Sequence, residues 1–229
     1  MPASSSPELA DPSACRNPAD GDRGWGYGGA VDADDVRLAA AACRSALSPT
    51  LELDWTVSAG DLNLAVCEVV AHLGDTLLWY AADLAAGPVE LSTMDLRVRP
   101  AAPPSRLLDT VVAHAAVLTA VVASAAPGAR GWHPAGPADA SGFAAMACDE
   151  ILVHTADAAT GLGRPFVPDP ALAAGVLHRL FPWAPEDEDP WAALLWCNGR
   201  TALGDRPRRC GWRWHCAPID EWDGQQPVG

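Results

Sequence analysis

The sequence predicts an all-α fold, a bundle of helices followed by a small C-terminal α/β element. About half of the 229 residues are apolar, and these are mostly Ala, Val and Leu, a composition that favours helix. Apolar residues recur at three- and four-residue steps along several long segments, as they do on the buried face of a helix. Stretches rich in Pro and Gly separate these segments and predict the loops between them.

The elements follow in a simple order. Residues 1–33 are rich in Pro, Ser, Asp and Gly and predict a mobile arm. Asp34 or Asp35 is placed to cap the first helix, and Ser58 or Asp61 the second. The five helices of the bundle are expected at about residues 34–47, 58–86, 105–125, 138–160 and 170–180.

The C-terminal part, residues 185–229, is predicted to be a separate small element after a bundle at residues 34–184. The stretch WAALLWCNGR predicts a short helix, and the alternation in RPRRCGWRWHCAPI predicts a strand or hairpin. The acidic run at residues 186–189 is typical of a solvated loop.

Charge and composition exclude several classes of function. The formal net charge is −14, which argues against a nucleic-acid binder and against docking on anionic membranes. No apolar stretch is expected to reach the roughly 20 residues of a membrane span, and the polar N-terminus does not resemble a secretory signal. Seven cysteines at scattered spacings, without a CxxC pair, predict reduced thiols. We therefore expect a cytoplasmic protein.

The sequence contains one candidate metal-binding pair. Glu150 and His154 lie four residues apart in CDEILVHTAD, so a helix would place both side chains on one face. Apolar neighbours predict that this segment is buried, where an unpartnered carboxylate is costly. His72, from VVAHLGDTLLWYA in another expected helix, offers a third ligand. The alternatives are an exposed Glu–His pair and a His72 whose hydrogen bonds are satisfied within the core.

Two longer stretches carry a family resemblance. DWTVSAGDLNLAVCEVVAHL resembles the segment around the first metal histidine of mycothiol-dependent maleylpyruvate isomerase N-terminal domains, which belong to the DinB-like superfamily. DEILVHTADAATG resembles their second metal motif, and LLWCNGR resembles their C-terminal segment. The resemblance implies a DinB-like four-helix bundle with His72, Glu150 and His154 as ligands of one divalent metal, and Asp157 matches the aspartate of the motif.

The sequence also departs from the family pattern. Members often carry an arginine shortly before the glutamate motif, whereas FAAMAC has none, and the tail WRWHCAPIDEWDG does not match the isomerase's own C-terminal domain. The resemblance therefore bears more strongly on fold and metal than on substrate.

The implied site would leave one metal position open for a water or a thiol. A thiol bound there would lose its proton and become a nucleophile at neutral pH. Asp157 is expected to orient a ligand imidazole, or else to be solvated. Arg200 is expected to pair with a substrate carboxylate, although an arginine ending a helix is favourable for dipole reasons alone. Zinc is the first choice of metal, and nickel, iron and manganese suit the same donors.

Other polar residues receive weaker interpretations. His215 is expected either at the rim of the site or packed beneath an aromatic pair, and Cys148 lies on a different helix face from Glu150. An arginine cluster could recognise an anion, although a solvated basic loop is the commoner outcome; it comprises Arg206, Arg208, Arg209 and Arg213.

The leading functional hypothesis is a metal-dependent enzyme that uses a mycothiol-type thiol, with mycothiol as co-substrate, for S-transfer or isomerisation of a small electrophile. The alternatives are a metal-dependent hydrolase that activates water, a non-catalytic binding module that retains the fold, and a purely structural polar trio. The expected partners are thus a small thiol and a small organic substrate. A homodimer stays open, because a bundle can pair through any apolar face.

Overall fold

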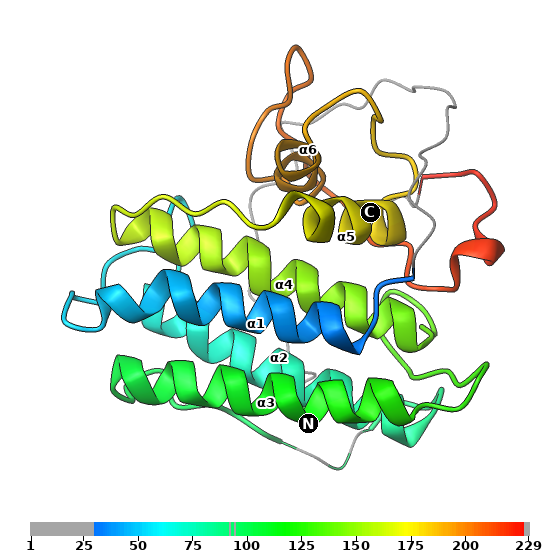
Figure 1. Cartoon of the computed structure of the whole chain (residues 1–229), viewed down its shortest axis with the longest axis horizontal. Coiled ribbons are helices and arrows are strands. Elements are labelled where there is room, and N and C mark those ends of the chain that lie inside the picture. The colour runs from blue at the N-terminus through cyan, green and yellow to red at the C-terminus, as the bar shows by residue number, and fades with distance from the viewer. Residues whose placement is uncertain (1–29, 92, 94, 227–229) are drawn as a thin grey trace.

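Four long helices form the body of the molecule. The computed structural model describes residues 30–91, 93 and 95–226. Each long helix packs against two neighbours, in the cyclic order α1, α3, α2, α4 (Figure 1). The four are α1 (Ala33–Leu47), α2 (Val66–Ala86), α3 (Pro104–Ser124) and α4 (Ala140–Gly161). This arrangement confirms the all-α bundle.

Two shorter helices form a second layer on α4. Helix α5 (Pro170–Leu180) packs on α4, and α6 (Pro190–Cys197) packs on α5, above the bundle in Figure 1. Two 3-10 turns, Ser48–Thr50 and Ile219–Glu221, complete the helical structure of the described residues.

Helix α4 is covered on nearly every side, because it contacts α1 and α2 within the bundle and α5 outside it. Apolar side chains along its length, such as Phe143, Met146 and Ile151, are fully buried. Its polar residues Asp149 and Asp157 are buried as well. Polar groups in such a place must find partners within the protein, since water is scarce there.

The first helix begins slightly earlier than expected. Asp32 is the N-cap of α1, and its Oδ1 accepts the backbone N–H of Asp34 at 2.7 Å. The Asp35 carboxylate accepts the backbone N–H of Asp32 at 2.9 Å and completes a capping box. Asp34 and Asp35 therefore lie in the first turn, where negative charge also favours the helix dipole.

The second helix begins later than expected, at Val66 and not near Ser58 or Asp61. Residues 57–66 form a closed loop, with the Ala59 N–H donating to Leu64 O and the Val66 N–H to Val57 O, both at 2.9 Å. These bonds engage backbone groups that a helix would use. The loop leads into α2, whose first turn is capped by the Glu68 side chain.

The expected C-terminal hairpin is absent from residues 185–226, which contain α6, the 3-10 turn Ile219–Glu221, loops and one isolated bridge. The backbone N–H of His215 donates to Leu180 O at 2.8 Å, at the end of α5. The buried Arg179 donates to the carbonyls of His215 and Cys216 at 3.1 and 3.2 Å. A helix end and a guanidinium thus take the backbone groups that a strand partner would have paired.

The acidic run at residues 186–189 is more than a solvated loop. Asp189 caps α6 by accepting the Ala192 N–H at 2.9 Å. Glu188 pairs with Arg206 at 2.8 Å and so ties the run to the C-terminal loop.

The expectation that no apolar stretch reaches the length of a membrane span is wrong for helix α3. It has 21 residues with a mean hydropathy of 1.8 and, by length and composition alone, is apolar enough to cross a membrane. In the structure it is a wall of the bundle and packs on α1 and α2.

The expectation that the cysteines are reduced thiols is correct for most, but not all, of the described ones. Five are free thiols, as predicted, but Cys210 is disulfide-bonded. The free ones are Cys43, Cys67, Cys148, Cys197 and Cys216. Residues 1–29 of the expected arm lie outside the described residues.

Candidate metal centre

Neighbouring helices α2 and α4 bring the three predicted ligands together. Nε2 of His154 lies 3.1 Å from Oε2 of Glu150, and Nε2 of His72 lies 3.6 Å from the same oxygen. One ligand atom from each residue falls within 4.8 Å of the others. The two imidazoles meet edge to face, with ring centroids 5.3 Å apart. We refer to His72, Glu150 and His154 as the triad.

The triad is closed on one side and open on the other. The side chains of His154 and Glu150 are only 11% and 13% exposed, whereas that of His72 is 42% exposed. A small molecule can therefore approach from the α2 side while α4 holds two of the polar groups away from water.

The buried oxygen of Glu150 indicates what the triad is suited to bind. Oε2 makes no hydrogen bond of acceptable geometry, although two imidazole nitrogens lie near it. Nδ1 of His154 faces Asp157 at 3.0 Å, which places a proton on Nδ1 and, in the neutral ring, a lone pair on Nε2. Two acceptors that face each other need a proton or a metal ion between them. Donors around a tetrahedral zinc ion lie about 3.3 Å apart, so the donor set fits a divalent metal.

The ionisation of the triad supports the same conclusion. Burial opposes the charge on Glu150, but contact with His154 and His72 outweighs it and holds the pKa of Glu150 well below its ordinary value. Burial also opposes charge on His154, yet Asp157 and Glu150 outweigh it and raise the pKa of His154 to about 9. The triad thus attracts positive charge, and a metal ion bound there would replace a proton.

Asp157 and Arg200 support the triad from behind. Asp157 is 6% exposed and accepts from His154 Nδ1, so it fixes the orientation of that ring. Arg200 donates two hydrogen bonds to the Asp157 carboxylate, from Nη2 at 2.8 Å and from Nε at 3.3 Å. Burial raises the pKa of Asp157, but His154 and Arg200 outweigh it and the net shift is downward.

Residues 198–200, directly after α6, bring Arg200 to the Asp157 carboxylate. Gly199 has φ +65°, and a Cβ there would lie 2.6 Å from the carbonyl oxygen of Arg209, so only glycine fits the turn. The Asn198 side chain donates to Asp149 at 2.8 Å, and the Asn198 carbonyl accepts from Arg200 Nη1 at 2.9 Å. The second layer of helices therefore completes the surroundings of a site built in the bundle.

Asp149 is a component of the site that the sequence analysis missed. It is 1% exposed and accepts from Asn198 and, at 3.0 Å, from Nε1 of Trp214. Burial, helped by the charge of Glu150, raises the pKa of Asp149 to about 7. Its position beside Glu150 was the only signal in the sequence, and that signal does not reveal its distant partners.

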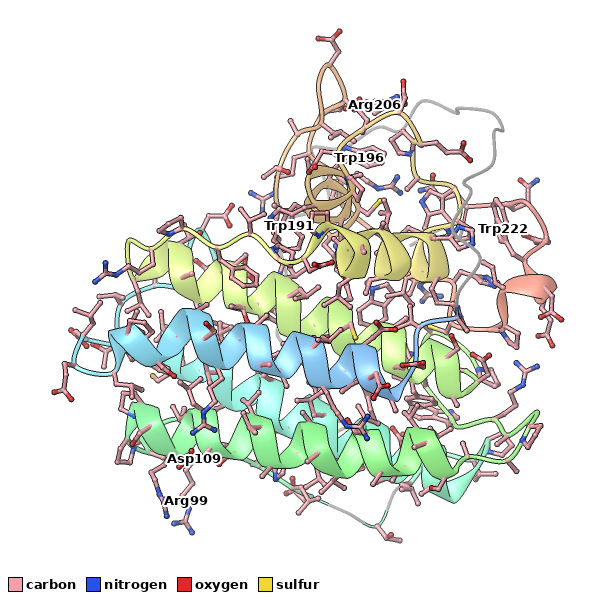
Figure 2. The ribbon with its side chains drawn as sticks, in the orientation of Figure 1. Arg99, Asp109, Trp191, Trp196, Arg206 and Trp222 are labelled. Carbon is pink, nitrogen blue, oxygen red and sulfur yellow. The ribbon has the colours of Figure 1, made fainter. Side chains whose placement is uncertain are left out.

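The arginine cluster divides among separate partners. Arg206 pairs with Glu188 and lies beyond Trp191 and Trp196 of α6 (Figure 2). Arg208 pairs with Asp61, and Arg209 stacks 4.8 Å above the ring of Trp196.

The structure also shows the surroundings of His215 and Cys148, the other two residues singled out from the sequence. Nε2 of His215 lies 3.0 Å from Pro218 O. Cys148 is fully buried, and burial raises the pKa of its thiol well above the ordinary value, which agrees with its exclusion as a nucleophile.

Comparison with protein families matched residues 36–159 to the mycothiol maleylpyruvate isomerase N-terminal domain. The match covers more than half of the chain and contains all three residues of the triad together with Asp157. Comparisons with curated proteins and with solved structures gave no match.

Proposed function

The chain belongs to the family of mycothiol maleylpyruvate isomerase N-terminal domains, and from this premise we propose that it is a metal-dependent enzyme. It activates a low-molecular-weight thiol of the mycothiol type for S-transfer to, or thiol-assisted isomerisation of, a small electrophile. The membership supports the metal-binding, mycothiol-related class, and the reaction is our inference.

The observation that carries the proposal is the buried Oε2 of Glu150, which lies between two imidazoles without a hydrogen bond of acceptable geometry. Two histidines and one glutamate are three protein donors, which is the number found in catalytic zinc sites that keep a position open for water or substrate. Structural zinc sites, in contrast, are closed by four protein ligands. Zinc suits this donor set, and nickel, iron and manganese remain alternatives.

The protein's own groups determine what happens at the open position. A divalent ion, when bound, supplies the positive charge that favours the thiolate form of a coordinated thiol. The exposed flank of His72 gives a thiol access, and the buried flank of His154 and Glu150 limits competing water. Asp157, itself held by Arg200, keeps the lone pair of His154 Nε2 directed toward the ligand position. Because Arg200 is engaged by Asp157, its expected contact with a substrate carboxylate stays a prediction.

Thiol binding to a cobalt-loaded protein tests the proposal. Co²⁺ replaces Zn²⁺ in such sites, and a coordinated thiolate adds an intense charge-transfer absorption that water does not give. We expect this band on adding mycothiol to the wild type and to the control His178→Ala, and not with His72→Ala. A cobalt-loaded protein that hydrolyses esters but shows no band would favour water activation instead. Failure to take up cobalt would contradict both functions.

A further inference from the structure

Tyr80 is largely buried, and its hydroxyl has no partner among the described residues. The residue as a whole is 6% exposed. The hydroxyl oxygen is not fully buried, so an incoming group can reach it. The Tyr80 hydroxyl is therefore available to a ligand.

His133 offers a second unused donor next to Tyr80, with ring centroids 5.7 Å apart. Its Nδ1 accepts the backbone N–H of Ala135 at 3.1 Å, so the proton of the neutral ring lies on Nε2. Burial lowers the pKa of His133 to about 4, which keeps the ring neutral at physiological pH. No hydrogen bond from Nε2 occurs among the described residues.

The loop that carries His133 is held firmly. Gly131 and Ala138 exchange backbone hydrogen bonds of 2.9 and 3.0 Å and close the loop at its base. A Cβ on Gly131 would lie 2.6 Å from the Phe143 ring and 2.7 Å from Leu84 Cα, so the base packs directly on the bundle. The imidazole is thus presented from a fixed support, as preorganised binding requires.

Several contacts connect this donor pair with the surroundings of the triad. Tyr80 follows His72 by eight residues on α2, about 12 Å along the helix axis. The Trp214 ring lies 5.7 Å from that of His133, and its indole N–H donates to Asp149, the neighbour of Glu150. Burial raises the pKa of Tyr80 and lowers that of His133, and the charge of Glu150 acts on both groups in the upward direction.

We propose that Tyr80 and His133 together bind an acceptor oxygen, carbonyl or carboxylate, of a small molecule whose other end lies at the triad. This inference rests on the proposed function and specifies its substrate class. The two neutral donors recognise oxygen, whereas the triad, through its bound ion, takes sulfur. The aromatic rings of Phe143 and Trp214 border the donors.

Matched thiols test the donor pair in the cobalt-loaded protein. 3-Mercaptopropionate carries a carboxylate, its methyl ester carries a carbonyl, and 1-propanethiol carries neither. Their affinities are measured by the charge-transfer band, and propionate binding is followed separately by the visible cobalt spectrum. We expect the wild type to prefer at least one oxygen-bearing thiol over 1-propanethiol by about tenfold.

Tyr80→Phe and His133→Phe remove the donors and keep the rings. Each should reduce the preference to near unity, while cobalt content and 1-propanethiol affinity stay at the wild-type level, as they should with the control His178→Phe. A preference for the acid or for the ester identifies the kind of oxygen. An unchanged preference in both variants overturns the inference. If no thiol gives a band, the proposed function fails, and the donor pair is then judged by whether Tyr80→Phe abolishes propionate binding.

Discussion

At the scale of single residues, Asp157 connects the metal centre to the outer layer of helices. One of its oxygens accepts from His154 and from Arg200 at 3.0 and 2.8 Å. A carboxylate in this position fixes the tautomer of the imidazole and increases its strength as a ligand. These contacts suit Asp157 to positioning His154.

Asp157→Asn should weaken metal binding without eliminating it. The amide cannot accept from His154 with the same strength, and we expect a loss of about 10- to 100-fold in zinc affinity. Competition with a chromogenic chelator measures this loss, with the exposed Asp205→Asn as control. Equal affinities for Asp157→Asn and the wild type would show that His154 needs no such support.

Residue spacing predicted part of the site. The four-residue step between Glu150 and His154 needed only a helix to bring both side chains to one face, and the structure does so. His72 joins this pair only because α2 packs on α4. Family resemblance predicted that His72 belongs to the site, whereas apolar periodicity alone did not. Asp149, Tyr80 and His133 were missed because their significance depends on contacts with distant loops, such as the one that carries Trp214.

At the scale of elements, close approach of backbone fixes the end of α4. A Cβ on Gly161 would lie 2.2 Å from Ser58 O and 3.0 Å from Ala59 Cα, both atoms of the loop that precedes α2. Gly175 in α5 differs, because its Cβ would meet only Val31 at 3.7 Å, an ordinary contact. A Cβ atom therefore fits at Gly175 but not at Gly161.

The two alanine substitutions should act in opposite directions. Gly161→Ala forces α4 away from the loop and should lower the free energy of unfolding by roughly 2 kcal/mol or more. Gly175→Ala should raise it by about 0.5–1 kcal/mol, since alanine loses less backbone entropy in a helix. Denaturant unfolding of both variants measures the difference. A neutral Gly161→Ala would mean that the loop yields easily.

Helix existence was more predictable from the sequence than helix boundaries or the C-terminal structure. Apolar periodicity and Pro or Gly breaks located the four bundle helices and α5, but local loop bonds moved the start of α2 to Val66. The alternation near Trp212 and Trp214 suggested a strand, yet these rings pack against each other and against Phe181 and His133. Aromatic packing in an irregular segment can imitate strand alternation.

At the scale of the whole molecule, the excess of acidic groups makes stability depend on pH. Asp83 is one of these groups, 6% exposed in the last turn of α2, where the helix dipole also disfavours negative charge. Burial, with the charge of Glu90, raises the pKa of Asp83 to about 6. The unfolded chain ionises this group at lower pH than the folded protein does. The ionised form of Asp83 therefore lowers the free energy of unfolding, and this loss grows as the pH rises from about 4 to 6 and above.

Asp83→Asn should remove this cost. We expect the variant to be more stable than the wild type by about 1 kcal/mol at pH 7, after allowance for partial solvent screening. The advantage should shrink toward zero below about pH 4, where Asp83 is protonated in both states. Thermal unfolding across this range measures it, with Asp205→Asn as control. A pH-independent difference would show that ionisation of Asp83 is not the cause.

The central claim is that His72, Glu150 and His154 together hold one divalent metal ion. Elemental analysis of the purified wild type beside His154→Ala tests it most directly, with His178→Ala as a matched control. We predict about one equivalent of metal in the wild type and the control, and little or none in His154→Ala. A wild type that is free of metal and takes up neither added Zn²⁺ nor Ni²⁺, or a His154→Ala variant that keeps its metal, would contradict the claim.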